Sequence, residues 1–211
     1  MTASTTLREM TGLPQEPPRL SESVLIMIDF QNTYRTGVMR LDGAEEAVAA
    51  GARLLAAARA AGTPVVHVVN DGGEGTPYDI RAEIGSISDE VAPVAGEKVV
   101  VKRFPDAFHG TDLEETLKDL GAGRDLVLAG FMTHMCVMFT AQGAFHLGHR
   151  PTVVAEATAT RPLPAPDGTV LPADALAAAS LTAVSDLFGT VVRTVDDIVA
   201  PAPVARSVSV A

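Results

Sequence analysis

The sequence is short of several residue types, and each shortage excludes a class of protein. It has one cysteine and no tryptophan, aromatic residues make up 4% of it, and charged residues only 20%. A single cysteine cannot close a disulfide within the chain. So few aromatic side chains leave no stacking platform for nucleic-acid bases. The hydrophobic fraction of 47% argues against a largely disordered chain.

Further absences concern partners and location. No apolar run is long enough to span a bilayer, so we expect no membrane partner. Lysine and arginine form no cluster and the formal net charge is −10, which disfavours nucleic acid as a partner. Residues 1–20 show no basic start followed by an apolar stretch. Together with the lone cysteine, this favours a cytoplasmic location.

What the chain does contain is an alternation of strand-like and helix-like segments between two polar ends. We interpret residues 1–20 as an N-terminal arm, either loose or lying on a neighbouring subunit, and residues 200–211 as a C-terminal tail. One domain is expected over residues 21–199. The predicted strands are Val24–Asp29, Pro64–Val69, Lys98–Lys102, Asp125–Gly130, Arg150–Glu156 and Thr190–Val195.

Helices are predicted between these strands. They cover residues 43–61, a segment opened by a capping box of Thr111 and Glu114, the segment after Gly130, and Ala173–Leu187. Strand–helix alternation of this kind implies right-handed crossovers. The sequence therefore predicts an α/β fold, a three-layer α/β/α sandwich around a six-stranded, mostly parallel sheet.

Three reactive side chains stand where predicted strands end. Asp29 closes the first strand, Lys102 closes the third, and Cys136 follows the fourth. Ligands of parallel sheets bind beyond the carboxyl ends of the strands, so these side chains are expected in one crevice if their strands are adjacent. A helix start lowers a thiol pKa, and Lys102 would hold the thiolate by charge. Asp29 would accept the thiol proton and later give it to a leaving amine.

The same residues have plainer interpretations. A lone cysteine is most often a small buried apolar residue. Asp29 and Lys102 would then form a structural ion pair beside an unrelated thiol. A separation of more than about 8 Å between the three side chains would exclude the hydrolase chemistry. A dinucleotide-binding domain is not supported, because no GxGxxG follows the first strand.

Three segments carry a resemblance to a known family. They are VLIMIDFQN around Asp29, VVVKRFPDAFHGTDLEETL around Lys102, and LVLAGFMTHMCVMFTAQGAFHLGHRPTVVAEATAT around Cys136. The chain resembles the isochorismatase-like cysteine hydrolases, which include nicotinamidases, N-carbamoylsarcosine amidases and ureidoacrylate amidohydrolases. This resemblance implies a Rossmann- or flavodoxin-like fold with Asp29 as base and acid, Lys102 as thiolate stabiliser and Cys136 as nucleophile.

The resemblance also implies a cis peptide between Phe131 and Met132. The backbone N–H groups of Met132 and Cys136 would form an oxyanion hole. The reaction would pass through a thioester on Cys136, which water then hydrolyses.

The chain departs from some of these relatives. Nicotinamidases carry a metal on the loop after the second strand, but here HVVNDGGEGTPYDI has no Asp-x-His pair, so we expect no metal and no cofactor. The presence of Cys136 favours hydrolysis of an amide, a carbamoyl compound or a lactam. The alternatives are an isochorismatase-type vinyl-ether hydrolase with Cys136 incidental, and a catalytically silent binding or scaffold protein.

The expected partner is a small-molecule substrate, and several residues are candidates to bind it. They are Phe30, Tyr34, Phe104, Phe108, Phe131 and Thr133. For the aromatic residues after the first and third strands, core or loop packing is an equal alternative. Arg161 follows the fifth strand, where it would meet an anionic substrate or remain a solvated loop residue. Relatives assemble as dimers or larger closed rings, so a homo-oligomer is expected.

Overall fold

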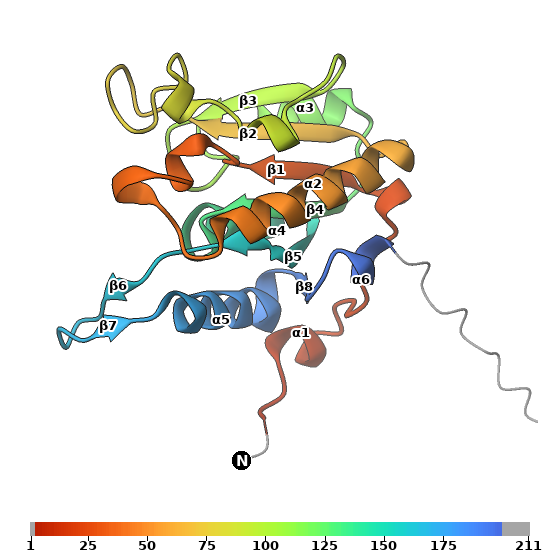
Figure 1. Ribbon diagram of the computed structural model, residues 1–211. Helices are drawn as coiled ribbons and strands as arrows, with labels where there is room; N and C mark the ends of the chain where they lie inside the picture. Colours follow the sequence, from red (N-terminus) through yellow and green to blue (C-terminus); the bar gives the residue numbers. More distant parts are fainter. Residues whose placement is uncertain (1–2, 200–211) are drawn as a thin grey trace, which may run out of the picture.

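The computed structural model, which describes residues 3–199, is built on one six-stranded sheet between two layers of helices (Figure 1). The strand order is β3-β2-β1-β4-β5-β8, and each neighbouring pair is parallel. The strands are β1 (Val24–Ile28), β2 (Val65–Asn70), β3 (Lys98–Lys102), β4 (Asp125–Phe131), β5 (Arg150–Ala159) and β8 (Thr190–Val192). The predicted three-layer α/β/α fold is confirmed, and this sheet is parallel throughout.

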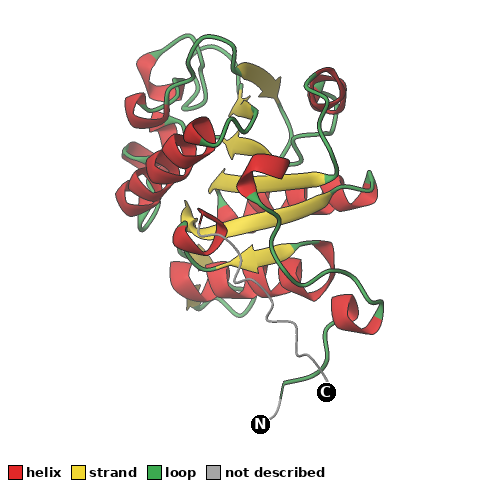
Figure 2. Cartoon of the chain, turned by 90° about the vertical axis from the view of Figure 1, so that its right-hand side faces the viewer, coloured by secondary structure: helices red, strands yellow, loops and turns green. Residues whose placement is uncertain are grey.

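Helices cover both faces of the sheet, as the end-on view shows (Figure 2). On one face α2 (Ala44–Ala60) packs on β1, β4 and β5 with its alanines and leucines. On the other face lie α3 (Leu113–Asp119), α4 (Met138–His146) and the end of the segment that begins with α5 (Ala173–Ala183). Since β1 and β4 are covered on both sides, nearly all their residues are apolar and buried.

The chain reverses its direction of travel across the sheet between β1 and β4. From β1 it proceeds through β2 to β3 at one edge, and from β4 it proceeds through β5 to β8 at the other. The carboxyl ends of β1 and β4 therefore flank a topological switch point, where α/β sheets open a crevice for ligands. Asp29 follows one of these strands and Cys136 follows the other.

The predicted capping box at Thr111 and Glu114 is wrong. Asp112 precedes α3 and no side chain caps that helix. The Thr111 hydroxyl instead accepts from the Leu113 N–H and donates to the Ala107 carbonyl, closing a tight turn before the helix. A capping box does occur at Thr6 and Glu9, within the predicted arm, and it opens the short helix α1 (Leu7–Met10).

The arm lies on its own chain. The Leu7 N–H donates to the Asp186 carboxylate at 3.0 Å, and the Arg8 guanidinium donates to the Leu187 carbonyl at 3.3 Å. These contacts hold the arm to η7 of the same chain, so the arm is not loose. Contact of the arm with a neighbouring subunit stays a prediction. The predicted tail, residues 200–211, lies outside the described residues.

The remaining elements are short. A hairpin of β6 (Leu163–Pro164) and β7 (Val170–Leu171) lies in the segment between β5 and α5, away from the main sheet (Figure 1). The others are η1 (Leu20–Glu22), η2 (Asn32–Tyr34), η3 (Gly37–Met39), η4 (Glu83–Gly85), η5 (Asp89–Val91), η6 (Thr133–Val137), η7 (Val184–Phe188) and α6 (Asp196–Val199). Within the described chain, every helix is too short or too polar to cross a membrane.

Candidate active site

Asp29 stands one residue beyond β1 with an unusual backbone. Its φ is 50°, in the left-handed region that residues other than glycine seldom adopt. Two hydrogen bonds hold this conformation, since its N–H donates to the Val68 carbonyl at 2.8 Å and its carbonyl accepts from the Gln31 N–H at 2.7 Å. Such strained residues cluster at functional sites, so the conformation itself draws attention to this carboxylate.

Cys136 is placed by the close approach of β4 to β1. At Gly130 the two backbones are so near that a Cβ atom would lie 1.8 Å from the Ile28 carbonyl oxygen. Beyond Phe131 the chain enters η6, a π-helical turn that carries Cys136, and α4 follows. The peptide bond between Phe131 and Met132 is cis. Single π-turns of this kind are frequent at functional sites.

Lys102 reaches the same place from farther away. Its strand β3 is separated from β1 by β2, so the three strands are not all adjacent. The long side chain bridges this gap: Nζ lies 2.7 Å from Asp29 Oδ2 and donates to Cys136 Sγ at 3.3 Å. Asp29 Oδ2 and Cys136 Sγ both contact this nitrogen, so the distance between them cannot exceed the sum of the two contact distances. The three side chains form one cluster within reach of proton transfer.

The cluster is buried. The exposed fractions are 0% for Asp29, 1% for Lys102 and 6% for Cys136. Burial raises the pKa of the Asp29 carboxyl, against the opposing effect of Lys102. For Lys102, burial acts to lower the pKa, but Asp29 and Cys136 outweigh it and the pKa is raised. Apart from this ion pair, neither Asp29 oxygen has a hydrogen-bond partner in residues 3–199, so the carboxylate has free capacity to accept a proton.

The expectation of a resting thiolate is wrong. Burial and the Asp29 carboxylate raise the pKa of Cys136 to about 12, and Lys102 offsets only part of this effect. The sequence shows the helix start and the lysine, which favour thiolate, but it does not show the depth of burial. Burial and Asp29 thus favour the protonated thiol in the resting site.

Three of the predicted substrate-binding residues pack together beside the cluster. The Phe131 ring lies 4.9 Å from that of Phe30 and 5.6 Å from that of Tyr34, measured between centroids. Phe30 belongs to the core, where its ring fills the space left by Gly51 of α2. Burial raises the pKa of the Tyr34 hydroxyl, and the charges of Asp29 and Cys136 raise it further.

The other three predicted substrate-binding residues are Phe104, Phe108 and Thr133, and they lie outside this group of aromatic rings. Phe104 is 53% exposed and its ring contacts His109 edge-on, while Phe108 stacks on His149. A substrate-binding role for these two rings stays a prediction. Thr133 is buried, and its hydroxyl has no hydrogen-bond partner among the residues described. It follows Met132 directly and offers an unused donor and acceptor next to the cluster.

Sequence analysis did not single out Tyr78. The chain has two tyrosines, and their rings pack edge to face with centroids 5.8 Å apart. Burial raises the pKa of Tyr78, Cys136 and Asp29 add to this effect, and Tyr34 and Arg161 oppose it. The sequence offered one signal that could have marked Tyr78 as a site residue: it lies in the Gly-rich segment after the second strand. Arg161 has a buried Nε without a hydrogen-bond partner in the described chain.

His134 has a structural environment. Its Nδ1 contacts the Thr160 hydroxyl, and burial, with a contribution from Arg161, lowers its pKa. It is therefore neutral near pH 7 and orients the turn that carries Cys136.

The residues that would have to hold a nicotinamidase-type metal do not fit one. His67 lies buried in β2 and contacts Glu97 at 2.9 Å, and Asp79 is held by Arg81 at 2.7 Å. In residues 3–199, no three His, Cys, Asp or Glu side chains are grouped as metal ligands. The donor side chains of this region are engaged with other protein groups.

Fold and cluster together define a class: parallel α/β/α proteins with a buried cysteine, lysine and aspartate at the switch point of the sheet. Comparison with known families gives a match to the isochorismatase domain over residues 23–196. The chain belongs to the isochorismatase-like cysteine hydrolase family, and it is a hydrolase of that family.

Individual relatives agree with this assignment. The secreted isochorismatase effector Isc1 of Verticillium dahliae is 34% identical, over 90% of this chain and 97% of its own length. The ureidoacrylate amidohydrolase RutB of Variovorax paradoxus is 31% identical over 89% and 85%. Among solved structures, an isochorismatase from Pseudomonas putida has a TM-score of 0.86 at 40% identity, covering 90% and 97%. N-carbamoylsarcosine amidase from Thermoplasma acidophilum has a TM-score of 0.65 at 26% identity, covering 82% and 96%.

Proposed function

We propose that this protein is a metal-independent cysteine hydrolase that cleaves a C–N bond of a small amide, carbamoyl or lactam substrate through a thioester. One observation carries the proposal: a single buried ammonium, that of Lys102, contacts both a carboxylate and a thiol. Relatives named as an amidohydrolase and an amidase support the choice of a C–N bond.

The charge of the cluster explains how a buried thiol with a high pKa can react. With a carboxylate, an ammonium and a neutral thiol, the cluster has no net charge. Transfer of the thiol proton to Asp29 leaves a carboxylic acid, an ammonium and a thiolate, again without net charge. Burial therefore opposes this internal transfer far less than it opposes loss of the proton to water. Burial also raises the pKa of Asp29, which favours the protonated carboxyl that this transfer produces.

The reaction then follows in balanced steps. The thiolate of Cys136 attacks the substrate carbonyl carbon, and the N–H groups of Met132 and Cys136 stabilise the oxyanion. The C–N bond breaks as Asp29 returns its proton to the leaving nitrogen, which gives a thioester and a free amine or ammonia. Asp29 then takes a proton from water and the resulting hydroxide attacks the thioester carbonyl carbon. The C–S bond breaks, the carboxylic acid leaves, and Asp29 gives the proton to the sulfur.

Around the cluster, the available side chains fit a small polar substrate. The Tyr34 and Tyr78 rings form an aromatic wall, and Thr133 offers an unpartnered hydroxyl. Arg161 has unused donor capacity in the same region. We infer that the substrate carries an anionic group, such as the carboxylate of a ureido or carbamoyl acid, which a guanidinium recognises by paired hydrogen bonds.

An amide-library screen tests the proposed function. Wild-type protein, treated with a chelator, is incubated with ureido acids, carbamoyl compounds, aliphatic amides and lactams, and released ammonia or amine is measured. Cys136→Ala serves as the blank. Activity is expected to survive chelation and to be absent from the blank. Loss of activity on chelation, or equal activity in the blank, would contradict the proposal.

The second candidate is a vinyl-ether hydrolase acting on a chorismate-like substrate, which the name of the Pseudomonas putida neighbour favours. In that case Cys136 is incidental, so Cys136→Ala would turn over such a substrate as fast as the wild type. A catalytically silent protein would turn over no member of either substrate class.

Cytoplasmic location stays a prediction, since the Verticillium relative is named as secreted; fractionation of the native cells would decide it.

A further inference from the structure

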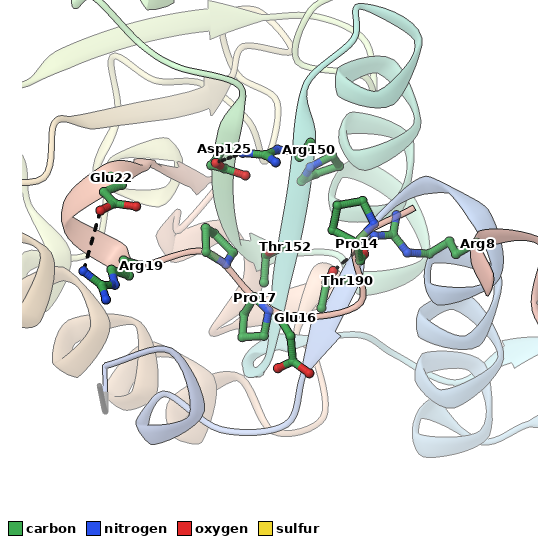
Figure 3. A pocket seen from close by; sticks show the side chains of 12 residues that line it. Arg8, Pro14, Glu16, Pro17, Arg19, Glu22, Asp125, Arg150, Thr152 and Thr190 are labelled. Atoms are coloured by element: carbon green, nitrogen blue, oxygen red, sulfur yellow. Dashed lines mark hydrogen bonds and ion pairs between the residues drawn. The ribbon is translucent and has the colours of Figure 1, made fainter. Parts of the chain in front are cut away.

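A cavity lies at the amino ends of the strands, opposite the carboxyl ends that hold the reactive cluster. It has a volume of about 310 Å³ and lies between the N-terminal arm and the first residues of β4, β5 and β8 (Figure 3). Since β4 spans seven residues at about 3.3 Å each, roughly 20 Å separate this amino edge from the carboxyl edge that holds Cys136. The cavity is therefore distinct from the candidate active site.

The cavity is lined by one buried cation, Arg8. This residue is 7% exposed, and it is the one arginine of residues 3–199 that is buried. Three contacts engage its guanidinium: the carbonyls of Pro14 and Leu187 and the Thr190 hydroxyl. A guanidinium has five N–H donors, so two remain, and Nε is one of them. All three acceptors are neutral.

No described carboxylate neutralises Arg8. Three carboxylates do line the cavity, but Asp125 is paired with Arg150, and Glu22 lies 3.9 Å from Arg19. Glu16 is exposed, and Figure 3 shows its side chain directed away from the Arg8 guanidinium. A buried charge without a counter-charge is costly, and proteins that keep one generally supply an opposite charge from a partner or ligand.

We propose that this cavity binds a small oxyanion, a carboxylate or phosphate, with the Arg8 guanidinium as its main ligand. The volume suits a small acid rather than a nucleotide. Thr152 and Thr190 line the same wall and bring hydroxyl donors. Burial of Arg8 lowers its pKa, as expected for a cation that lacks its counter-charge. Because Arg8 also donates to Pro14 and Leu187, a bound anion would hold the arm to the body of the domain.

Calorimetric titration tests the proposal on the full chain, independently of any catalytic activity. Inorganic phosphate and succinate are titrated separately at constant ionic strength, so that the two anion classes are distinguished. Wild-type protein is expected to bind at least one of them saturably. Arg8→Gln is expected to weaken that binding by about tenfold or more, which corresponds to loss of a charge-assisted contact. Arg193→Gln, which removes an exposed arginine outside the lining of this cavity, is the control and is expected to change it by less than about twofold.

Limited proteolysis of residues 1–20 shows whether Arg8→Gln keeps the arm in place. If the arm of Arg8→Gln is cleaved faster than that of the wild type, Arg8→Lys is titrated in its place. Lysine keeps the positive charge, so the Arg8→Lys protein is expected to bind the anion. The proposal is overturned if the wild type binds neither anion, if Arg8→Gln binds as tightly as the wild type, or if an Arg8→Lys protein with an intact arm has lost binding.

Discussion

Burial and the Asp29 carboxylate both disfavour a thiolate at Cys136 in the resting site. Lys102 offsets this effect without reversing it. The nucleophile is thus formed inside the cluster when its proton moves to Asp29, and reactivity toward an external reagent is a different property from catalytic competence.

The alkylation rate of Cys136 by iodoacetamide tests this protonation state. A pKa raised to about 12 leaves less thiolate at any given pH than a free thiol has. The rate is therefore expected to rise about tenfold per pH unit from pH 7 to 10, without a plateau. In Lys102→Met the rate should be lower still at each pH, because the stabilising ammonium is gone. A plateau near pH 8.5, or an unchanged profile in Lys102→Met, would contradict the assigned pKa order.

We assign to Arg161 the recognition of the anionic group of the substrate. Arg161→Gln is expected to raise KM for a carboxylate-bearing substrate by about tenfold, with kcat nearly unchanged, because a binding contact is lost and the reacting groups remain. A neutral amide analogue should be affected by less than about twofold. Arg193→Gln, at an exposed position, is the control. Equal effects on the charged and neutral substrates would exclude the assignment.

At the scale of elements, the strands were predictable because strands buried on both faces leave long apolar runs in the sequence. Lys98–Lys102 is reproduced residue for residue, and the predicted helix over residues 43–61 differs from α2 by one residue at each end. The π-turn with Cys136 was not predictable, since no residue type marks it. Nor was the β6–β7 hairpin, whose proline- and alanine-rich segment is typical of a loop.

The geometry of the site depends on the close approach of β4 to β1 at Gly130. Gly130→Ala is expected to destabilise the protein by more than about 3 kcal/mol, because the new methyl would overlap the Ile28 carbonyl and φ is 134°. Urea unfolding measures this difference. Gly123→Ala is the control, as nothing lies within 4 Å of its added Cβ, and it should cost less than about 1 kcal/mol. A Gly130→Ala protein as stable as this control would show that β4 and β1 tolerate a wider spacing.

At the scale of the molecule, part of the candidate site could be predicted because the carboxyl ends of parallel strands lie on the same side of the sheet. Asp29 and Cys136 meet there because β1 and β4 are neighbours. The contribution of Lys102 depends on strand order, which the sequence does not state, and on a side chain long enough to pass the end of β2. The contributions of Tyr78 and Arg161 depend on how loops fold over the edge, and their residue types carry no periodic signal.

The whole chain is expected to associate with copies of itself. β3 is an edge strand, and Val99 and Val101 on it are 47% and 46% exposed, close in sequence to the exposed Phe104. Uncovered apolar edges of this kind favour association. Light scattering should give a mass of at least twice 21.9 kDa at micromolar concentration. A mass of one chain at all accessible concentrations would contradict this expectation.

The most direct measurement of the central claim is kcat/KM of Cys136→Ala on the best substrate from the amide screen. The sulfur is the attacking atom in this account, so the variant is expected to lose at least about three orders of magnitude in kcat/KM. Its thermal unfolding should stay within a few degrees of the wild type, because alanine fits the same space. Activity within about tenfold of the wild type would contradict the account, since the C–N bond would then be cleaved without the thiol.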